Sequence, residues 1–163
     1  MIVIADTGPL NYLVQIDCVH VLPKLYGNVT ATTDVMQELM DPQAPEQVRR
    51  WASTPPSWLR TVNIQPLPSL SHLDQGEASA LAYASSLRTQ GESPLVLIDE
   101  IKGRRAAEAM GLAVRGTLGV LDTAGVQGLI RTSDALARLR TTSFHAQHQI
   151  FEAFLDRARS REA

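Results

Sequence analysis

The chain has 163 residues, 44% of them hydrophobic, and a formal net charge of −2. This length suits one compact domain with a single core, and we predict one domain over residues 1–163. The slight negative charge excludes a broad basic face, so we expect any nucleic acid to be bound locally or through a metal ion. The single cysteine, Cys18, excludes an internal disulfide and a structural zinc site.

Secreted and membrane-spanning proteins are also excluded. The first residues, MIVIADTG, lack a basic leader and a small-residue cleavage site, so they do not predict a signal peptide. No run reaches the roughly eighteen apolar residues that a membrane span needs. We therefore expect a soluble, cytoplasmic protein without a membrane partner.

The first half of the chain alternates short apolar runs, which predict strands, with apolar residues three and four apart, which predict helices. In chain order we expect a strand at residues 2–5, a helix around 10–16, a strand at 28–32, a helix around 35–40, a helix at 43–52 and an edge strand at 58–64. Thr33 or Asp34 is expected to cap the second helix, and Pro45 suits the first turn of the third.

The second half continues this alternation. The expected elements are a helix at 73–87, a strand at 95–98, a helix at 101–110, a strand at 113–115, a helix at 117–126, and terminal helices at 133–140 and 146–159. The run at 95–98 is fully apolar, which indicates a strand buried on both faces. Strands that alternate with helices predict an α/β fold, in which helices cover both faces of a parallel sheet of four to five strands.

Two aspartates occupy the position where ligands bind in such sheets. Asp6 and Asp99 each follow an apolar strand directly, and ligands sit beyond the carboxyl ends of strands at the topological switch point. Each acid also has a purely structural interpretation. Asp6 would cap the first helix, Asp74 and Glu77 have the spacing of a capping box, and Glu38 would lie on a solvated helix face.

The joint pattern of acids favours a metal site. Glu38 and Glu77 lie among apolar residues in helices that are expected to pack on the same sheet as Asp6 and Asp99. Converging carboxylates repel one another, and a hard divalent cation with oxygen ligands relieves that repulsion. Mg²⁺ or Mn²⁺ is therefore the expected ion.

Other catalytic classes lack their residues. His145 and His148 form the nearest approach to a zinc motif, and we do not expect them to bind a metal. The chain has no nucleophile elbow, P-loop or dinucleotide-binding glycine motif, and Cys18 is expected to be a buried, inert thiol. A phosphate-accepting enzyme of the haloacid-dehalogenase type would need a second aspartate at position 8, where Gly8 stands.

Four segments together resemble the PIN domain, the nuclease fold of VapC-type toxins. They occur in order within about residues 1–130, before the C-terminal helices of 131–163, and read IVIADTGPL, TTDVMQEL, LDQGEASALAYA and LVLIDEIKGRRAAEAMGLAVRGTLGVL. The resemblance implies a Rossmann-like three-layer α/β/α sandwich. Onto the family's acidic metal-binding quartet it carries Asp6, Glu38, Glu77 and Asp99. It also makes Thr7 a hydroxyl contact to a metal-bound water.

The sequence departs from the commonest family pattern at two positions. Glu77 stands where many members have aspartate, which adds one methylene of reach and keeps the ligand chemistry. Asp34 stands where an uncharged residue is more usual, for which we find no reason in the sequence. In addition, Glu100 is a spare acid beside Asp99, and either could bind the ion or support the site; we favour Asp99.

The implied reaction is hydrolysis of an RNA phosphodiester by a metal-activated water, with one or two Mg²⁺ or Mn²⁺ ions. Asp6 is the expected central ligand, Glu77 and Asp99 complete the metal site, and Glu38 orients water or a second ion. Single-stranded or looped RNA fits a compact acidic cleft better than a duplex does. The residues expected to hold substrate phosphates are Lys102, Arg104 and Arg105, with a solvated helix face as the alternative.

The resemblance also implies partners. A toxin of this type binds a small antitoxin protein; the alternative is a PIN-like module with weak catalysis that binds RNA or protein. The apolar faces of the terminal helices are expected to dock a partner or the second subunit of a homodimer, and packing within the chain's own core is the alternative. These faces consist of Leu136, Leu139, Ile150, Phe151, Phe154 and Leu155.

Overall fold

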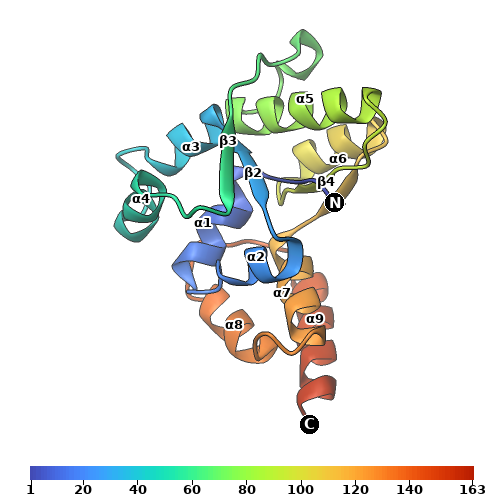
Figure 1. Ribbon diagram of the computed structural model, residues 1–163. Coiled ribbons are helices and arrows are strands. Elements are labelled where there is room, and N and C mark those ends of the chain that lie inside the picture. The colour runs from blue at the N-terminus through green and yellow to red at the C-terminus, as the bar shows by residue number, and fades with distance from the viewer.

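The computed structural model describes residues 1–163 and contains one five-stranded parallel sheet (Figure 1). Its strands are β1 (Val3–Ala5), β2 (Val29–Thr32), β3 (Leu59–Val62), β4 (Leu95–Leu97) and β5 (Ala113–Arg115). Their order across the sheet is β3-β2-β1-β4-β5, and all neighbours are parallel. The predicted α/β class is confirmed, with β3 at an edge and β4 in the interior.

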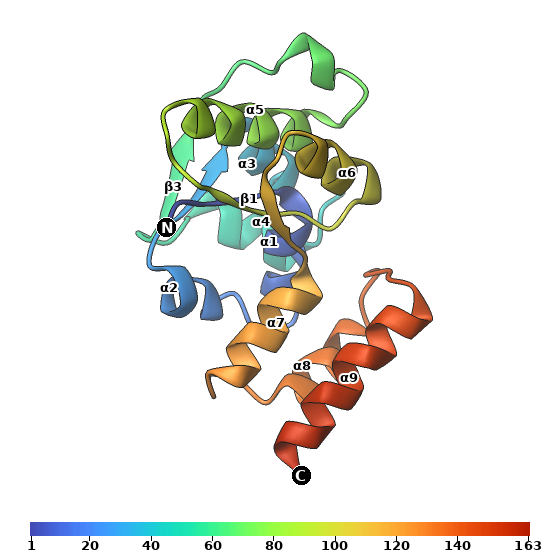
Figure 2. The same ribbon diagram turned by 90° about the vertical axis from the view of Figure 1, so that its right-hand side faces the viewer.

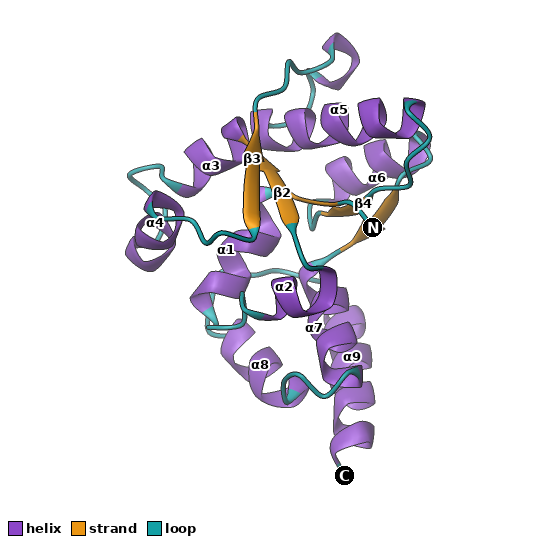
Figure 3. Ribbon diagram, viewed as in Figure 1, coloured by secondary structure: helices purple, strands orange, loops and turns teal.

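Helices connect the strands and extend beyond the last one (Figure 3). They are α1 (Thr7–Gln15), α2 (Val21–Tyr26), α3 (Thr33–Leu39), α4 (Glu46–Ser53), α5 (Gln75–Thr89), α6 (Ile101–Ala109), α7 (Thr117–Val126), α8 (Thr132–Leu139) and α9 (His148–Glu162). A short 3₁₀ turn, η1 (Pro68–Leu70), precedes α5. Neither α2 nor η1 was predicted, because each is too short to show a periodic pattern. None of the helices has the length and apolar content that crossing a membrane requires.

Two predicted helix starts were wrong. The side chain of Thr32, not that of Thr33 or Asp34, caps α3, since its hydroxyl oxygen accepts a bond from the backbone N–H of Val35 at 3.2 Å. α4 begins only at Glu46, with Pro45 as its N-cap in an extended conformation. A proline disfavours the helical conformation in the residue before it, so the helix cannot extend back to residue 43.

The helices cover both faces of the sheet, as the three-layer prediction requires. Successive strand residues point to opposite faces, and in β1 this places Val3 and Ala5 in one apolar cluster and Ile4 in another. Figure 2 shows α5 and α6 on one side of the sheet and α1, α2 and α7 on the other, with α8 and α9 beyond α7. The Rossmann-like three-layer sandwich is therefore confirmed.

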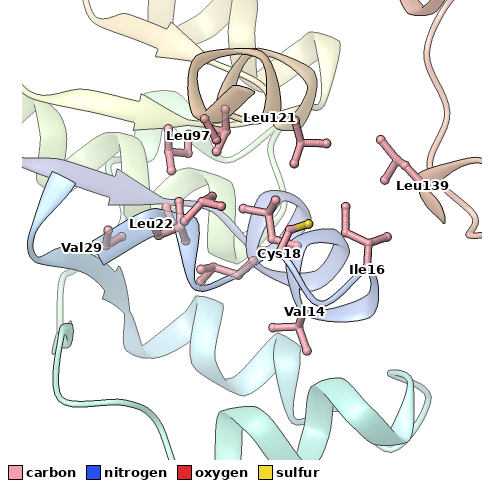
Figure 4. Close-up of a cluster of buried hydrophobic side chains, with 14 of the residues drawn as sticks. Val14, Ile16, Cys18, Leu22, Val29, Leu97, Leu121 and Leu139 are labelled. Atoms are coloured by element: carbon pink, nitrogen blue, oxygen red, sulfur yellow. The ribbon is translucent and has the colours of Figure 1, made fainter. Parts of the chain in front are cut away.

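The larger apolar cluster joins the sheet to the C-terminal helices. In Figure 4, Leu97 of β4, Leu121 of α7 and Leu139 of α8 lie around the buried Cys18. Arg138 of α8 donates from Nε to the carbonyl of Ile16 at 3.0 Å. The two terminal helices thus share one core with the strands.

This core accounts for most of the apolar faces that were expected to dock a partner. Four of the six residues are buried in it, namely Leu136, Leu139, Phe151 and Leu155. Phe154 packs against the same core while partly exposed, and Ile150 is 47% exposed. Most residues of these apolar faces therefore pack within the chain's own core, which was the alternative interpretation.

The strand order sets the position of the functional site. The chain runs from β1 outward to β2 and β3, and then returns to the other side of β1 to form β4 and β5. The switch point therefore lies between β1 and β4, the two strands that Asp6 and Asp99 follow.

We expect Leu136→Ala to lower the free energy of unfolding by about 2–5 kcal/mol, because the side chain is fully buried in the shared core. Urea denaturation monitored by circular dichroism measures this change. Ile150→Ala, at an exposed position of α9, is the control and should change stability by less than about 0.5 kcal/mol. Two separate unfolding transitions would contradict a single core.

Candidate metal centre

Asp6 is the most deeply buried acid of the chain, with 4% of its surface exposed. Its backbone N–H donates to the carbonyl of Leu97 at 2.9 Å, which ties the end of β1 to the end of β4. Although Asp6 stands at the N-cap position of α1, its side chain makes no capping bond. Oδ1 is buried without any hydrogen-bond partner, and such an atom costs free energy unless a proton or cation reaches it.

The other three acids act on Asp6 through their charge. Burial raises the pKa of Asp6 well above its ordinary value, and the backbone N–H of Thr7 opposes this shift. Negative charge on Glu77, Glu38 and Asp99 raises that pKa further. The structure therefore brings the four sequence-predicted acids into one electrostatic neighbourhood.

Glu77 is almost as inaccessible, with 5% of its surface exposed. Burial raises its pKa to about 7, and the charges of Asp74 and Glu100 add to the shift. Half of the capping box is present: the Glu77 carboxylate accepts from the backbone N–H of Asp74, which lowers its pKa, whereas the Asp74 side chain makes no capping bond to α5. Glu77 is thus a buried carboxyl in the first turn of α5 with no basic partner.

Asp99 is held by the first residue of α7. Thr117 donates from its backbone N–H to Oδ1 at 2.7 Å and from its hydroxyl to Oδ2 at 2.6 Å. Burial still raises the pKa of Asp99, although both Thr117 bonds and the charge of Arg104 lower it. Thr117 was missed in the sequence, where it reads only as a helix start.

Glu38 joins three helices. Its Oε1 accepts from the backbone N–H of Gly76 at 2.9 Å, and its Oε2 accepts from the hydroxyl of Thr7. A Cβ at position 76 would lie 2.5 Å from Glu38 Oε2, so a larger residue there would displace the Glu38 carboxylate. These contacts exclude the solvated-face interpretation of Glu38, and they direct the Thr7 hydroxyl proton to Glu38 and not to water. Gly76 was the second residue that the sequence did not reveal.

Two further acids now have an assigned position. Asp34 lies in the first turn of α3, where a negative charge is favourable at the positive end of the helix dipole. Glu100 is exposed at the N-cap of α6 and makes no capping bond. Because Asp99 is the more buried and better held of the pair, it remains the preferred site residue.

The three basic residues of α6 are not equivalent. Arg104 donates from Nη1 to the carbonyl of Ile98 at 3.3 Å and lies beside Asp99. Lys102 lines a pocket together with Glu77, whereas Arg105 is exposed and makes no hydrogen bond or ion pair. Two of the three predicted phosphate contacts therefore lie next to the acids.

The donor chemistry of the site fits a hard divalent cation. All four acids offer carboxylate oxygens, and Asp6 Oδ1 is a buried oxygen that needs a positive partner. No three His, Cys, Asp or Glu side chains stand close enough together to enclose a metal ion as they are placed.

The sequence matches a family model described as a PIN domain over residues 2–160. The chain therefore belongs to the PIN-domain family, whose members are generally nucleases and typically bind divalent metals. The match includes α8 and all but the last two residues of α9, which lie beyond the segments that carried the resemblance. No curated protein and no solved structure gave a significant match.

We expect Thr117→Val to lower the affinity for Mn²⁺ about 10- to 100-fold, because partners that hold a ligand in place typically contribute that much. Isothermal titration calorimetry measures the affinity. The matched control is Thr123→Val on the same helix, whose hydroxyl donates only to the carbonyl of Gly119. Equal affinities for the two variants would show that Thr117 does not support metal binding.

The buried acids also predict how metal-free stability depends on pH. The pKa of Glu77 is raised from 4.5 unfolded to about 7 folded, so its contribution is fully present below pH 4.5 and is lost as the pH rises through 7. Urea denaturation in the presence of chelator measures the free energy of unfolding at about pH 5 and about pH 8. We expect this free energy to fall less between the two pH values for Glu77→Gln than for the wild type. Identical pH profiles would show that burial does not disfavour the charged form of Glu77.

Proposed function

We propose that this PIN domain is a Mg²⁺- or Mn²⁺-dependent endoribonuclease that hydrolyses phosphodiester bonds in single-stranded or structured RNA. The observation that carries the proposal is the buried, unpartnered Oδ1 of Asp6 at the sheet's switch point. A structural aspartate at that position would cap α1 or pair with a cation, and Asp6 does neither. Membership of a family of nucleases supports the same function.

In this proposal Asp6, Glu77 and Asp99 hold one or two ions. When bound, the ion lowers the pKa of a water molecule and neutralises charge on the leaving oxygen, so no side-chain nucleophile is needed. Thr117 fixes both oxygens of Asp99 and so holds that ligand in one orientation.

Glu38 has a different part in the proposal. Both of its oxygens already accept hydrogen bonds, from Gly76 and Thr7. These bonds therefore fix the position of the start of α5, which carries Glu77, relative to α1. Its remaining lone pairs can orient the attacking water, which agrees with the role expected from the sequence.

The charges of the chain restrict how RNA binds. With a net charge of −2, the chain has no overall excess of basic residues, so we expect binding to depend on local cations and the ion itself. Arg104 and Lys102 lie nearest the acids and are the proposed phosphate contacts, with Arg105 as an outer one. Single-stranded RNA suits such a compact site better than a duplex.

We further propose that the protein is the toxin of a cytoplasmic toxin–antitoxin pair and that a small antitoxin binds it. This part rests on the sequence resemblance to VapC-type PIN domains. A homodimer would use what remains exposed of the terminal helices, around Ile150 and Phe154. The whole chain would act as one domain, since α8 and α9 share the core of the sheet.

The decisive measurement is cleavage of a mixture of RNAs by the full chain with Mg²⁺ or Mn²⁺. We expect chelator to abolish cutting and Asp6→Asn to lower the rate by more than about 100-fold, because even outer partners of metal ligands contribute 10- to 100-fold. Asn keeps the size of Asp and removes the charge, so the loss would reflect chemistry and not packing.

Asp122→Asn is the matched control, since Asp122 is a partly buried acid of α7 that pairs with Arg161 away from the site. It should retain wild-type cleavage. In cells, expression of the wild type should arrest growth, Asp6→Asn should not, and a short neighbouring reading frame should restore growth. Chelator-resistant cutting, or full activity of Asp6→Asn, would overturn the proposed mechanism.

A further inference from the structure

The pocket lined by Lys102 and Glu77 opens directly beside the proposed metal centre. It has a volume of about 330 Å³ and lies between the turn before α5 and the start of α6. Glu77 is part of its wall, so a molecule bound there would touch the metal centre. The volume is at the lower end for ligand sites and suits one nucleotide, not the face of a duplex.

Several side chains that line this pocket have no structural role within the chain. Ile101 is 59% exposed in the first turn of α6, and it belongs to neither apolar cluster. Lys102 is exposed and forms no ion pair, although Asp74, Glu77 and Glu100 line the same pocket. His72 is exposed as well and makes no hydrogen bond. An apolar surface, an imidazole ring and a free positive charge thus meet at one place.

These three groups match the parts of an unpaired nucleotide. A splayed base stacks on aromatic rings, including histidine, and packs against apolar side chains. A lysine ammonium binds a phosphate as a point charge. The three acids of the pocket repel phosphate, so the base enters the pocket and the phosphate stays at Lys102.

We propose that this pocket binds one unpaired nucleotide of an RNA strand, next to the phosphate that is cut. The base lies against Ile101 and His72, and its phosphate lies at Lys102. This inference rests on the proposed nuclease function and adds the specificity-determining contacts of that site. It also gives a structural reason for the preference for single strands, since a paired base cannot enter.

The test measures binding and cleavage separately, with full-length protein, Mn²⁺ and a short fluorescent single-stranded RNA. Fluorescence anisotropy with the Asp6→Asn chain keeps the RNA intact. In that background Ile101→Ser should weaken binding about tenfold, as loss of a base-stacking surface does. Lys102→Met should weaken binding and reduce its salt slope by about 1, as expected for one lost phosphate contact. In chains with Asp6 intact, both changes should raise KM and leave kcat within about twofold, because uniform binding is removed.

The chain provides a matched control for each change. Val126 is another exposed β-branched residue on a helix, and Lys24 is an exposed lysine on α2, so Val126→Ser and Lys24→Met should bind and cut RNA like their parent chains. If the pocket variants bind RNA as tightly as these controls while the wild type cuts, the subsite is overturned and the nuclease function stands.

The remaining outcomes are also decisive. Specific loss of binding in the pocket variants without any cutting by the wild type supports the subsite and overturns the nuclease function. Duplex RNA bound as tightly as the single strand, with the same losses, would overturn the single-nucleotide inference.

Discussion

The constraint on which the structure of the site depends is the burial of the Asp6 carboxyl at the end of a central strand. Burial disfavours the charged form of a carboxyl, and here one oxygen has no partner to offset that cost. The parallel sheet creates this position, because its switch point brings the ends of β1 and β4 together under the helices. A cation or a proton is what the position requires.

The four acids divide into two pairs by their hydrogen bonds. Glu38 and Asp99 each have both oxygens held by backbone or hydroxyl donors, which come from the starts of α1, α5 and α7. Asp6 and Glu77 have no such pair of donors. Burial raises the pKa values of Asp6, Glu77 and Asp99, so binding of a cation would relieve unfavourable charge at all three.

The C-terminal helices belong to the architecture that holds this site. α8 and α9 pack on α7, and α7 presents Thr117 to Asp99 at its opposite end. Most residues of the apolar faces of α8 and α9 are not free to dock a partner. They extend the core from Leu97 to Leu139. The family model matches both the sheet and these helices, over residues 2–160.

The sequence by itself determined the α/β alternation, the five strands and the two aspartates at strand ends, because periodicity and strand-end position are local properties of the chain. It also indicated the PIN resemblance through short segments such as IVIADTGPL. Only the tertiary structure showed that Glu38 accepts hydrogen bonds from Thr7 and Gly76 and that Thr117 donates to Asp99. It also showed that the apolar faces of the terminal helices are mostly buried in the core. Each of these contacts joins residues that lie far apart in the chain, so no spacing rule reveals them; Thr117 bonds an acid 18 positions earlier, and Glu38 reaches 31 positions back and 38 ahead. The difference is physical, since local patterns specify elements, whereas the pairing of polar groups depends on where folding brings those elements together.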